Sequence, residues 1–168
     1  MDYKIFKMGL FLFLLFLTGC NQPVKIIEKY PDGKIKQEGI LLNGQKDGVA
    51  KLYYTNGKLQ QEGLWRKGKQ IGFWSFYYET GELYARINFK DNLQEGPAIY
   101  YYPNGQIAEK SYWVSSKANG LSETFYMSGN KKSSTNFKNN LKDGEVLNFD
   151  SLGRLKSKEL WKNGKLMQ

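Results

Sequence analysis

Glycines recur at a fixed spacing of 24 residues through most of this chain, and this period restricts the fold more than any other feature. One series is Gly33, Gly57, Gly81, Gly105, Gly129 and Gly153. Another is Gly48, Gly72, Gly96, Gly120 and Gly144. A third is Gly44, Gly68, Asn92, Ser116, Asn140 and Gly164, in which only Ser116 is neither glycine nor asparagine. Because glycine and asparagine tolerate left-handed backbone, each series predicts a recurring turn within tandem repeats.

Each repeat contains two extended runs separated by turn signals. In the second repeat, Thr55-Asn56-Gly57 predicts a turn, 58–65 a strand, 66–72 a glycine-rich connection and 73–78 a returning strand. We therefore expect an all-β fold, an elongated antiparallel meander of twelve strands in six tandem 24-residue β-hairpin repeats. The repeats occupy residues 28–168.

Aligning the repeats gives three apolar columns that we expect on one face of the sheet. The columns are Leu41, Trp65, Phe89, Trp113, Phe137 and Trp161; Tyr53, Tyr77, Tyr101, Phe125 and Phe149; and Ile35, Leu59, Leu83, Ile107, Lys131 and Leu155. Between the first and third lie mostly small residues: Gly39, Gly63, Ser111, Ser133 and Ser157. We expect rings to cover the small positions and form the core. The alternative is an aromatic platform for glycan or choline.

The first twenty residues are typical of a bacterial lipoprotein signal. Lys4 and Lys7 precede an apolar run at 8–17, which is too short to span a bilayer as a helix. The segment Leu17-Thr18-Gly19-Cys20 resembles a lipobox, which implies cleavage before Cys20 and lipidation of its sulfur. We expect a signal peptide at 1–19 and a lipidated tether at 20–27. The alternative is an uncleaved buried helix.

Composition narrows the chemistry open to the chain. Histidine is absent, Cys20 is the only cysteine, and the net charge is +9. Most zinc sites, thiolate nucleophiles and histidine-based acid–base pairs are thereby excluded, and we expect no metal, no cofactor and no catalytic residue. The best carboxylate pairs are Glu62 with Glu79 and Asp91 with Glu95. The basic excess favours anionic partners, without specifying nucleic acid, which we do not expect.

The second repeat is similar to a known repeat family. Tyr54-Thr55-Asn56-Gly57-Lys58-Leu59, followed by Glu62-Gly63, Trp65, Gly68-Lys69, Gly72 and Trp74, resembles the MORN-repeat variant found in YwqK-like antitoxins. The resemblance covers residues 28–168. It is weaker in repeats four to six, where Ser116 and Glu159 replace glycines. It implies a hairpin-repeat fold with the character of a binding module.

A basic stripe is the candidate binding site. Strict alternation along the first strand of each repeat puts two positions per repeat on the face opposite the apolar columns. From the third repeat onward every charge there is positive. The candidate residues are Tyr84, Arg86, Lys110, Lys132, Lys156 and Lys158. The alternative is that these lysines only protect the strands against aggregation.

Two functional classes follow from these observations. One is an envelope scaffold that is anchored to the membrane through lipid on Cys20 and binds a protein or an anionic envelope polymer. The other is an antitoxin or immunity protein that neutralises one toxin. Asn21, rather than an aspartate, follows Cys20 and favours the outer membrane, or the outer face of the cell membrane where no outer membrane exists.

Overall fold

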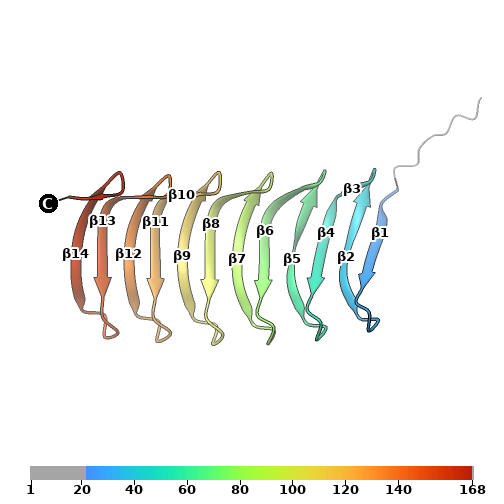
Figure 1. Cartoon of the computed structure of the whole chain (residues 1–168), viewed down its shortest axis with the longest axis horizontal. Helices are drawn as coiled ribbons and strands as arrows, with labels where there is room; N and C mark the ends of the chain where they lie inside the picture. The colour runs from blue at the N-terminus through green and yellow to red at the C-terminus, as the bar shows by residue number, and fades with distance from the viewer. Residues whose placement is uncertain (1–21, 168) are drawn as a thin grey trace, which may run out of the picture.

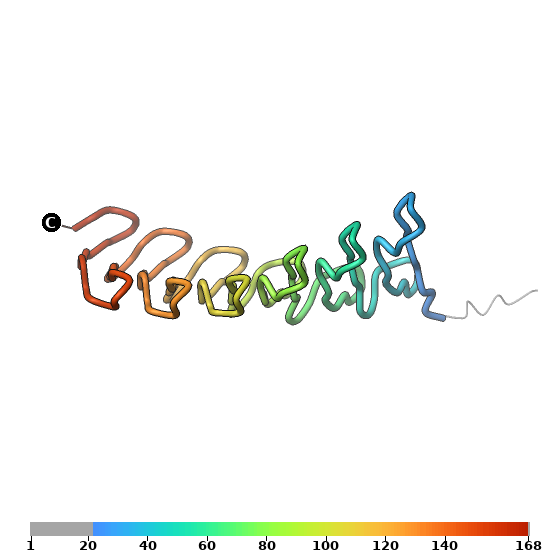
Figure 2. The backbone as a smooth tube through the Cα atoms, turned by 90° about the horizontal axis from the view of Figure 1, so that it is seen from below, coloured from blue at the N-terminus to red at the C-terminus, as the bar shows by residue number. Residues whose placement is uncertain are grey.

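The computed structural model describes residues 22–167, which form one open antiparallel sheet. Strands run across the long axis of the molecule and follow one another in chain order (Figure 1). Viewed at right angles, the backbone forms a row of similar loops along that axis (Figure 2). The expected signal peptide and Cys20 lie outside the described residues. The expected all-β meander of hairpins is confirmed.

The strands fall into two sets that alternate along the sheet. The first strands of the repeats are β2 (Ile35–Leu42), β5 (Leu59–Arg66), β7 (Leu83–Lys90), β9 (Ile107–Val114), β12 (Lys131–Lys138) and β14 (Leu155–Lys162). The returning strands are β1 (Val24–Lys29), β3 (Gln45–Lys46) with β4 (Gly48–Tyr53), β6 (Lys69–Tyr77), β8 (Leu93–Tyr101), β10 (Lys117–Ala118) with β11 (Gly120–Phe125), β13 (Leu141–Phe149) and β15 (Lys165–Leu166).

Two expected boundaries and the expected number of strands were wrong. The returning strand β6 begins at Lys69 rather than at residue 73, because only Lys67 and Gly68 form the turn and Gly72 lies inside the strand. Residues 24–27, expected in the tether, belong to β1 and pair with β2. The described residues contain fifteen strand segments rather than twelve strands, partly because two returning strands are each divided into two segments.

The two sides of the sheet carry different turns. On one side, two-residue turns such as Lys67-Gly68 and Asp91-Asn92 have both residues at positive φ. This is the geometry of a type I′ hairpin, whose twist matches that of the strands. On the other side, Gly57 donates its backbone NH to the carbonyl of Tyr54 and has a φ of 85°. Such a turn with a left-handed glycine explains the first glycine series.

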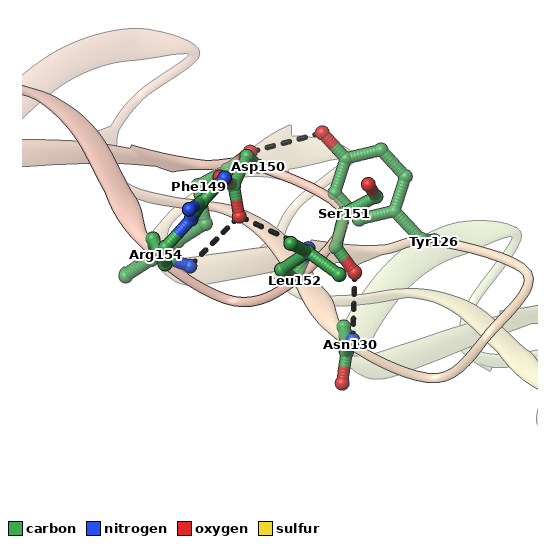
Figure 3. Close-up of polar contacts among 7 residues, drawn as sticks. All are labelled: Tyr126, Asn130, Phe149, Asp150, Ser151, Leu152 and Arg154. Atoms are coloured by element: carbon green, nitrogen blue, oxygen red, sulfur yellow. Dashed lines mark hydrogen bonds and ion pairs between the residues drawn. The ribbon is translucent and has the colours of Figure 1, made fainter.

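Tyrosine side chains join the second kind of turn to the next repeat. Tyr30, Tyr54, Tyr78, Tyr102 and Tyr126 each donate a hydroxyl hydrogen bond to a backbone carbonyl 23 residues later, at distances of 2.6 to 2.9 Å. In the sixth repeat Asp150 replaces tyrosine, and its carboxylate accepts from the backbone NH groups of Leu152 and Arg154 (Figure 3). Asp150 therefore closes its own turn, whereas each tyrosine connects two repeats.

The two-residue turns also connect neighbouring repeats. Asn92 donates its backbone NH to the carbonyl of Gln70, and its side-chain oxygen accepts from the Gln70 NH. Ser116 makes the same two bonds to Gln94, with its hydroxyl as the acceptor at 3.0 Å. Ser116 therefore retains the left-handed backbone, with a φ of 61°, although it departs from the glycine and asparagine pattern.

A cluster of buried side chains lies in the third repeat and beside it. Trp74 is 2 % exposed, and Ala85, Ile87 and Ala98 form a buried cluster nearby. A Cβ atom added at Gly63 would lie only 2.1 Å from the Trp74 ring. The expectation that rings cover the small positions is therefore confirmed at Gly63. We call the face that carries Trp74 and this cluster the core face, and the opposite face the open face.

A bulge in the first strand of each repeat moves side chains between the two faces. Phe76 pairs with Ala85, but the next residue, Tyr77, pairs with Leu83, so Tyr84 is an extra residue. In such a bulge two successive side chains point to the same side. In the first repeat, Lys36 and Gln37 accordingly both donate to the carboxylate of Glu28.

The expectation that all three apolar columns share one face was therefore wrong. The column of Trp65 lies on the core face, where Trp65 contacts Trp74 edge to face at 5.5 Å. The column of Tyr77 lies on the open face, where the Tyr77 hydroxyl donates to the Glu62 carboxylate. The column of Leu83 lies on the same face, because Leu83 is the cross-strand partner of Tyr77. Regular alternation predicted the wrong face because it did not include the extra residue.

Candidate binding surface

The structure divides the predicted basic stripe between the two faces. Tyr84 lies on the core face, where its ring is 5.1 Å from Tyr78 and 5.8 Å from Tyr100. Lys132 occupies the same bulge position, with its Nζ atom 5.8 Å from the ring of Tyr126. Lys156 is again the extra residue, between Leu155 and Ser157. These three residues do not lie on the expected face.

Arg86, Lys110 and Lys158 lie on the open face, opposite the column of Trp65 but on the same face as the column of Tyr77, and Arg86 and Lys110 come together. Arg86 and Lys110 both pair with Ile99, one from each neighbouring strand. The guanidinium of Arg86 lies 5.2 Å from the Phe73 ring, and the Lys110 ammonium lies 5.7 Å from the Phe125 ring. Lys158 lies apart from them and forms an ion pair with Glu145 at 2.6 Å.

Most other cations of the open face are neutralised by carboxylates. Lys25 pairs with Glu38 at 3.0 Å, and Lys51 pairs with Glu62 at 3.9 Å. Lys131 pairs with Glu123 in the same way. Among residues 22–167, Arg86 and Lys110, the basic centre of this face, take part in no ion pair, although Glu123 pairs with Lys110 across the strands. Aromatic rings hold both cations in place while leaving their charge free for an anionic partner.

Exposed apolar side chains run beside this basic centre. The open-face residues that follow Gly48, Gly72 and Gly120 are strongly exposed: Val49 at 53 %, Phe73 at 51 % and Leu121 at 47 %. Tyr112, which pairs with Pro97, is 50 % exposed. These positions were not identified from the sequence, because they lie outside the three aligned apolar columns. Exposed aromatic rings next to unpaired cations are characteristic of protein contact surfaces.

Carboxylates hold two tyrosines of the open face. Tyr53 donates to Glu38 at 2.6 Å, and Tyr77 donates to Glu62 at 2.9 Å. Burial, together with the hydrogen bond to Glu38, raises the pKa of Tyr53 to about 12. Burial likewise raises the pKa of Tyr77. Both phenols therefore remain protonated donors at neutral pH, and we assign these pairs a structural role.

Three of the four candidate carboxylates have structural partners. The Glu62 carboxylate accepts from the Tyr77 hydroxyl. Glu95 accepts from the backbone NH of Ser115 at 2.8 Å, and Asp91 lies 3.6 Å from the Lys69 ammonium. Within the described part of the chain, no group of acidic or cysteine side chains could hold a metal ion. Residues 22–167 also contain no helix with the length and apolarity needed to cross a bilayer.

The repeated turns, the paired strands and the glycine positions can now be compared with known families. Three segments match the MORN repeat variant. The matched residues are 46–67, 72–91 and 94–114, so they cover the central hairpins that contain Trp74, Arg86 and Lys110. No curated protein matches the chain. MORN repeats are generally non-enzymatic and support the description of this sheet as a repeat-based interaction scaffold.

Proposed function

We propose that this chain is a lipid-anchored, non-catalytic scaffold of the bacterial envelope, whose open face binds an anionic polymer or an acidic protein surface. The observation that carries the proposal is the pair Arg86 and Lys110, which form no ion pair within the described residues and which exposed apolar side chains adjoin. An anionic partner would gain Coulomb attraction without displacing an existing ion pair.

The anchor is the second part of the proposal. It is supported by the basic residues, the short apolar run and the lipobox-like Leu17-Thr18-Gly19-Cys20. Two or more acyl chains would hold the protein durably at a membrane. Replacing the only thiol in Cys20→Ser should abolish labelling by palmitate in growing cells. Persistent labelling of the variant would show that the anchor lies elsewhere.

The division of the basic residues between the faces supplies a matched test of binding. Arg86→Glu with Lys110→Glu changes the open face, whereas Lys132→Glu with Lys156→Glu changes the core face by the same charge. We expect the first pair to weaken retention on anionic glycan or acidic vesicles at low salt, and the second pair to have little effect. Exposed charges are screened beyond about 10 Å at 0.1 M salt, so the difference should shrink as salt rises.

Two results would contradict the proposed surface. If both double variants lose retention equally, only net charge matters and the open face has no special role. If neither loses retention while circular dichroism shows an intact sheet, the basic residues only keep the protein soluble. Cross-linking in intact cells followed by mass spectrometry would identify the partner. A tight one-to-one complex with a single toxin would favour the antitoxin alternative over a scaffold.

A further inference from the structure

The core face has a recurring contact between one position of each first strand and one position of the returning strand. The equivalent pairs are Gly39 with Ala50, Gly63 with Trp74, Ile87 with Ala98, Ser111 with Ser122, and Thr135 with Val146. Both Ile87 with Ala98 and Thr135 with Val146 are direct cross-strand partners. In most repeats at least one member is large, so the side chains fill the space between the two strands.

Two repeats have only small residues at this contact. In the fourth repeat the neighbouring Trp113 compensates, because its indole donates to the Ser111 hydroxyl at 3.0 Å. In the first repeat the residue equivalent to Trp113 is Leu41, which has no ring. The contact between Gly39 and Ala50 therefore lacks the aromatic ring that covers the equivalent contact in the second and fourth repeats.

A cavity of about 70 Å³ lies at this place. Ile26, Gly39, Ala50 and Leu52 line it on one side, and Trp65 and Trp74 line it from the second repeat. A Cβ atom added at Gly39 would meet Ala50 at 3.5 Å, an ordinary contact, whereas one added at Gly63 would overlap the Trp74 ring. Gly39 is itself buried, but the space beside it would accept a Cβ atom, whereas an indole occupies the equivalent space in the second repeat.

We propose that this cavity binds the side chain of a tryptophan presented by a partner protein. The second repeat shows the fit, since Trp74 covers Gly63 there and packs edge to face with Trp65 at 5.5 Å. A dry, apolar cavity of about 150 Å³ accommodates benzene. The present cavity has half that volume and is also lined by Gln37 and Gln61, so it takes one edge of an indole and leaves the rest in its mouth. The Lys46 ammonium, 4.6 Å from the Trp65 ring, adds a cation at the cavity.

This site is separate from the basic centre of the open face and does not depend on its function. The incoming ring contacts Trp65 and Trp74 edge to face, a geometry that aromatic pairs favour over stacking face to face. An aliphatic side chain would fill the same space without these ring contacts. The site therefore prefers tryptophan to leucine.

Four indole groups in one chain provide an internal control for the test. The protein without its first twenty residues is suitable, because every described strand pairing lies within residues 24–166. The isotope-labelled protein is titrated with unlabelled N-acetyl-tryptophanamide, and the indole NH signals are followed by NMR. We expect the signals of Trp65 and Trp74 to move and those of Trp113 and Trp161 to stay. N-acetyl-leucinamide should produce smaller shifts at the same concentration.

Two variants fill the cavity from opposite strands. Ala50→Trp copies Trp74, and Gly39→Ile copies Ile87, so each should lower the affinity for the probe at least tenfold. Val49→Trp adds the same side chain to the same strand on the open face and should bind as the original protein does. Thermal melting checks that each variant is folded. If one of the two cavity-filling variants does not fold, the other alone tests the proposal.

Several outcomes would overturn the proposal. Movement of no indole signal, or of all four together, would show that the probe does not recognise this cavity. Equal shifts with N-acetyl-leucinamide would show that the cavity does not select a ring. Unchanged binding in a folded filling variant would place the probe somewhere else. None of these results depends on Arg86 or Lys110, so the proposed function is tested separately.

Discussion

Gly39 and Gly63 occupy the same place in successive repeats, yet their surroundings differ. A Cβ atom at Gly63 would overlap the Trp74 ring at 2.1 Å, whereas one at Gly39 would touch Ala50 at 3.5 Å. Trp74 is almost fully buried and cannot move aside without disturbing Trp65 and Phe89, which both contact its ring. Neither glycine has the positive φ of the turn positions, so the backbone conformation does not require glycine at either place. Glycine is required at 63 because the Trp74 ring leaves no room for a Cβ atom.

The first prediction compares these two glycines. Gly63→Ala should lower the free energy of unfolding by about 2–3 kcal/mol, since overpacking a filled site forces neighbours out of place. Gly39→Ala should change the same quantity by less than about 1 kcal/mol, because alanine also suits a strand better than glycine. Urea unfolding followed by circular dichroism measures both. Equal effects would mean that the ring does not constrain Gly63.

Tyr53 provides a prediction about pH. Its pKa rises from 10.0 to about 12 in the folded protein, because burial and the hydrogen bond to Glu38 favour the protonated phenol. A group with a raised pKa contributes stability below its unfolded pKa and loses it as pH rises through the folded pKa. The stability contribution of Tyr53 should therefore be complete below pH 10 and decline between pH 10 and about 12.

The measurement is the alkaline dependence of unfolding. The difference in free energy of unfolding between the original protein and Tyr53→Phe should fall across this pH interval. A constant difference between the original protein and Tyr53→Phe at all pH values would contradict the assigned role of the hydroxyl.

At the scale of the hairpin, six equivalent two-residue turns use different residues for one backbone geometry. Lys67 has a φ of 49°, although lysine has no side-chain group suited to left-handed backbone. The first repeat has Asn43 at the equivalent position, with a φ of 52°. Asparagine visits this conformation more readily than residues with longer side chains do. Lys67 is therefore a locally unfavourable choice that the sheet imposes.

Lys67→Asn should raise the free energy of unfolding by about 0.5–1 kcal/mol by relieving this strain. The backbone NH of residue 67 would keep its hydrogen bond to the Asp47 carboxylate. Lys90→Asn removes an equally exposed lysine from a strand end that lacks positive φ, and it should not stabilise the protein. A thermal melt that is unchanged by Lys67→Asn would show that the turn carries no such strain.

The turns could be predicted from the sequence, but the faces of the strands could not. Glycine and asparagine mark left-handed positions directly, so the period and the hairpins followed from Gly57, Gly68 and their equivalents. The bulge has no such marker: its extra residue is lysine at 36, tyrosine at 84 and alanine at 108. One added residue reverses the side to which the preceding side chains point, so Tyr84 and Lys132 were assigned to the wrong face.

The candidate site was predicted only in part for the same reason. Arg86 and Lys110 were assigned correctly to the face opposite the Trp65 column, because no bulge separates them from the centre of their strands. That neither takes part in an ion pair, although Glu123 pairs with Lys110 across the strands, could not be predicted from the sequence. The cavity beside Ala50 was also invisible in the sequence, where alanine and glycine in a strand suggest only small core residues.

At the scale of the whole molecule, each repeat depends mainly on its neighbours. Tyrosine hydroxyls and turn amides reach only into the adjacent repeat, and strands pair in chain order. Arrays of this kind gain stability from nearest-neighbour contacts rather than from one central core. Removing one complete period should therefore reconnect equivalent residues and preserve the contacts.

Deleting residues 103–126 joins Tyr102 to Met127, which reproduces the sequence relation between Tyr126 and Met127. Tyr102 should then donate to the carbonyl of Phe149, as Tyr126 does in the original chain. We expect a folded sheet with a cooperative melt. Deleting only residues 103–114 removes the first strand β9 but keeps the returning strand that follows it. That strand would then run in the wrong direction beside β8, so we expect cooperative melting to be lost. Similar melts for the two deletions would contradict the repeat-by-repeat description.

Strands that lie across the long axis also determine how the molecule would respond to a pulling force (Figure 1). Tension applied between the two ends of the array loads the hydrogen bonds of one strand pair at a time, so hairpins would peel off in sequence. Each detached repeat would release up to about 80 Å of chain, given about 3.3 Å per extended residue. The force would then rise and fall once per repeat, which makes the array an extensible tether with regular steps.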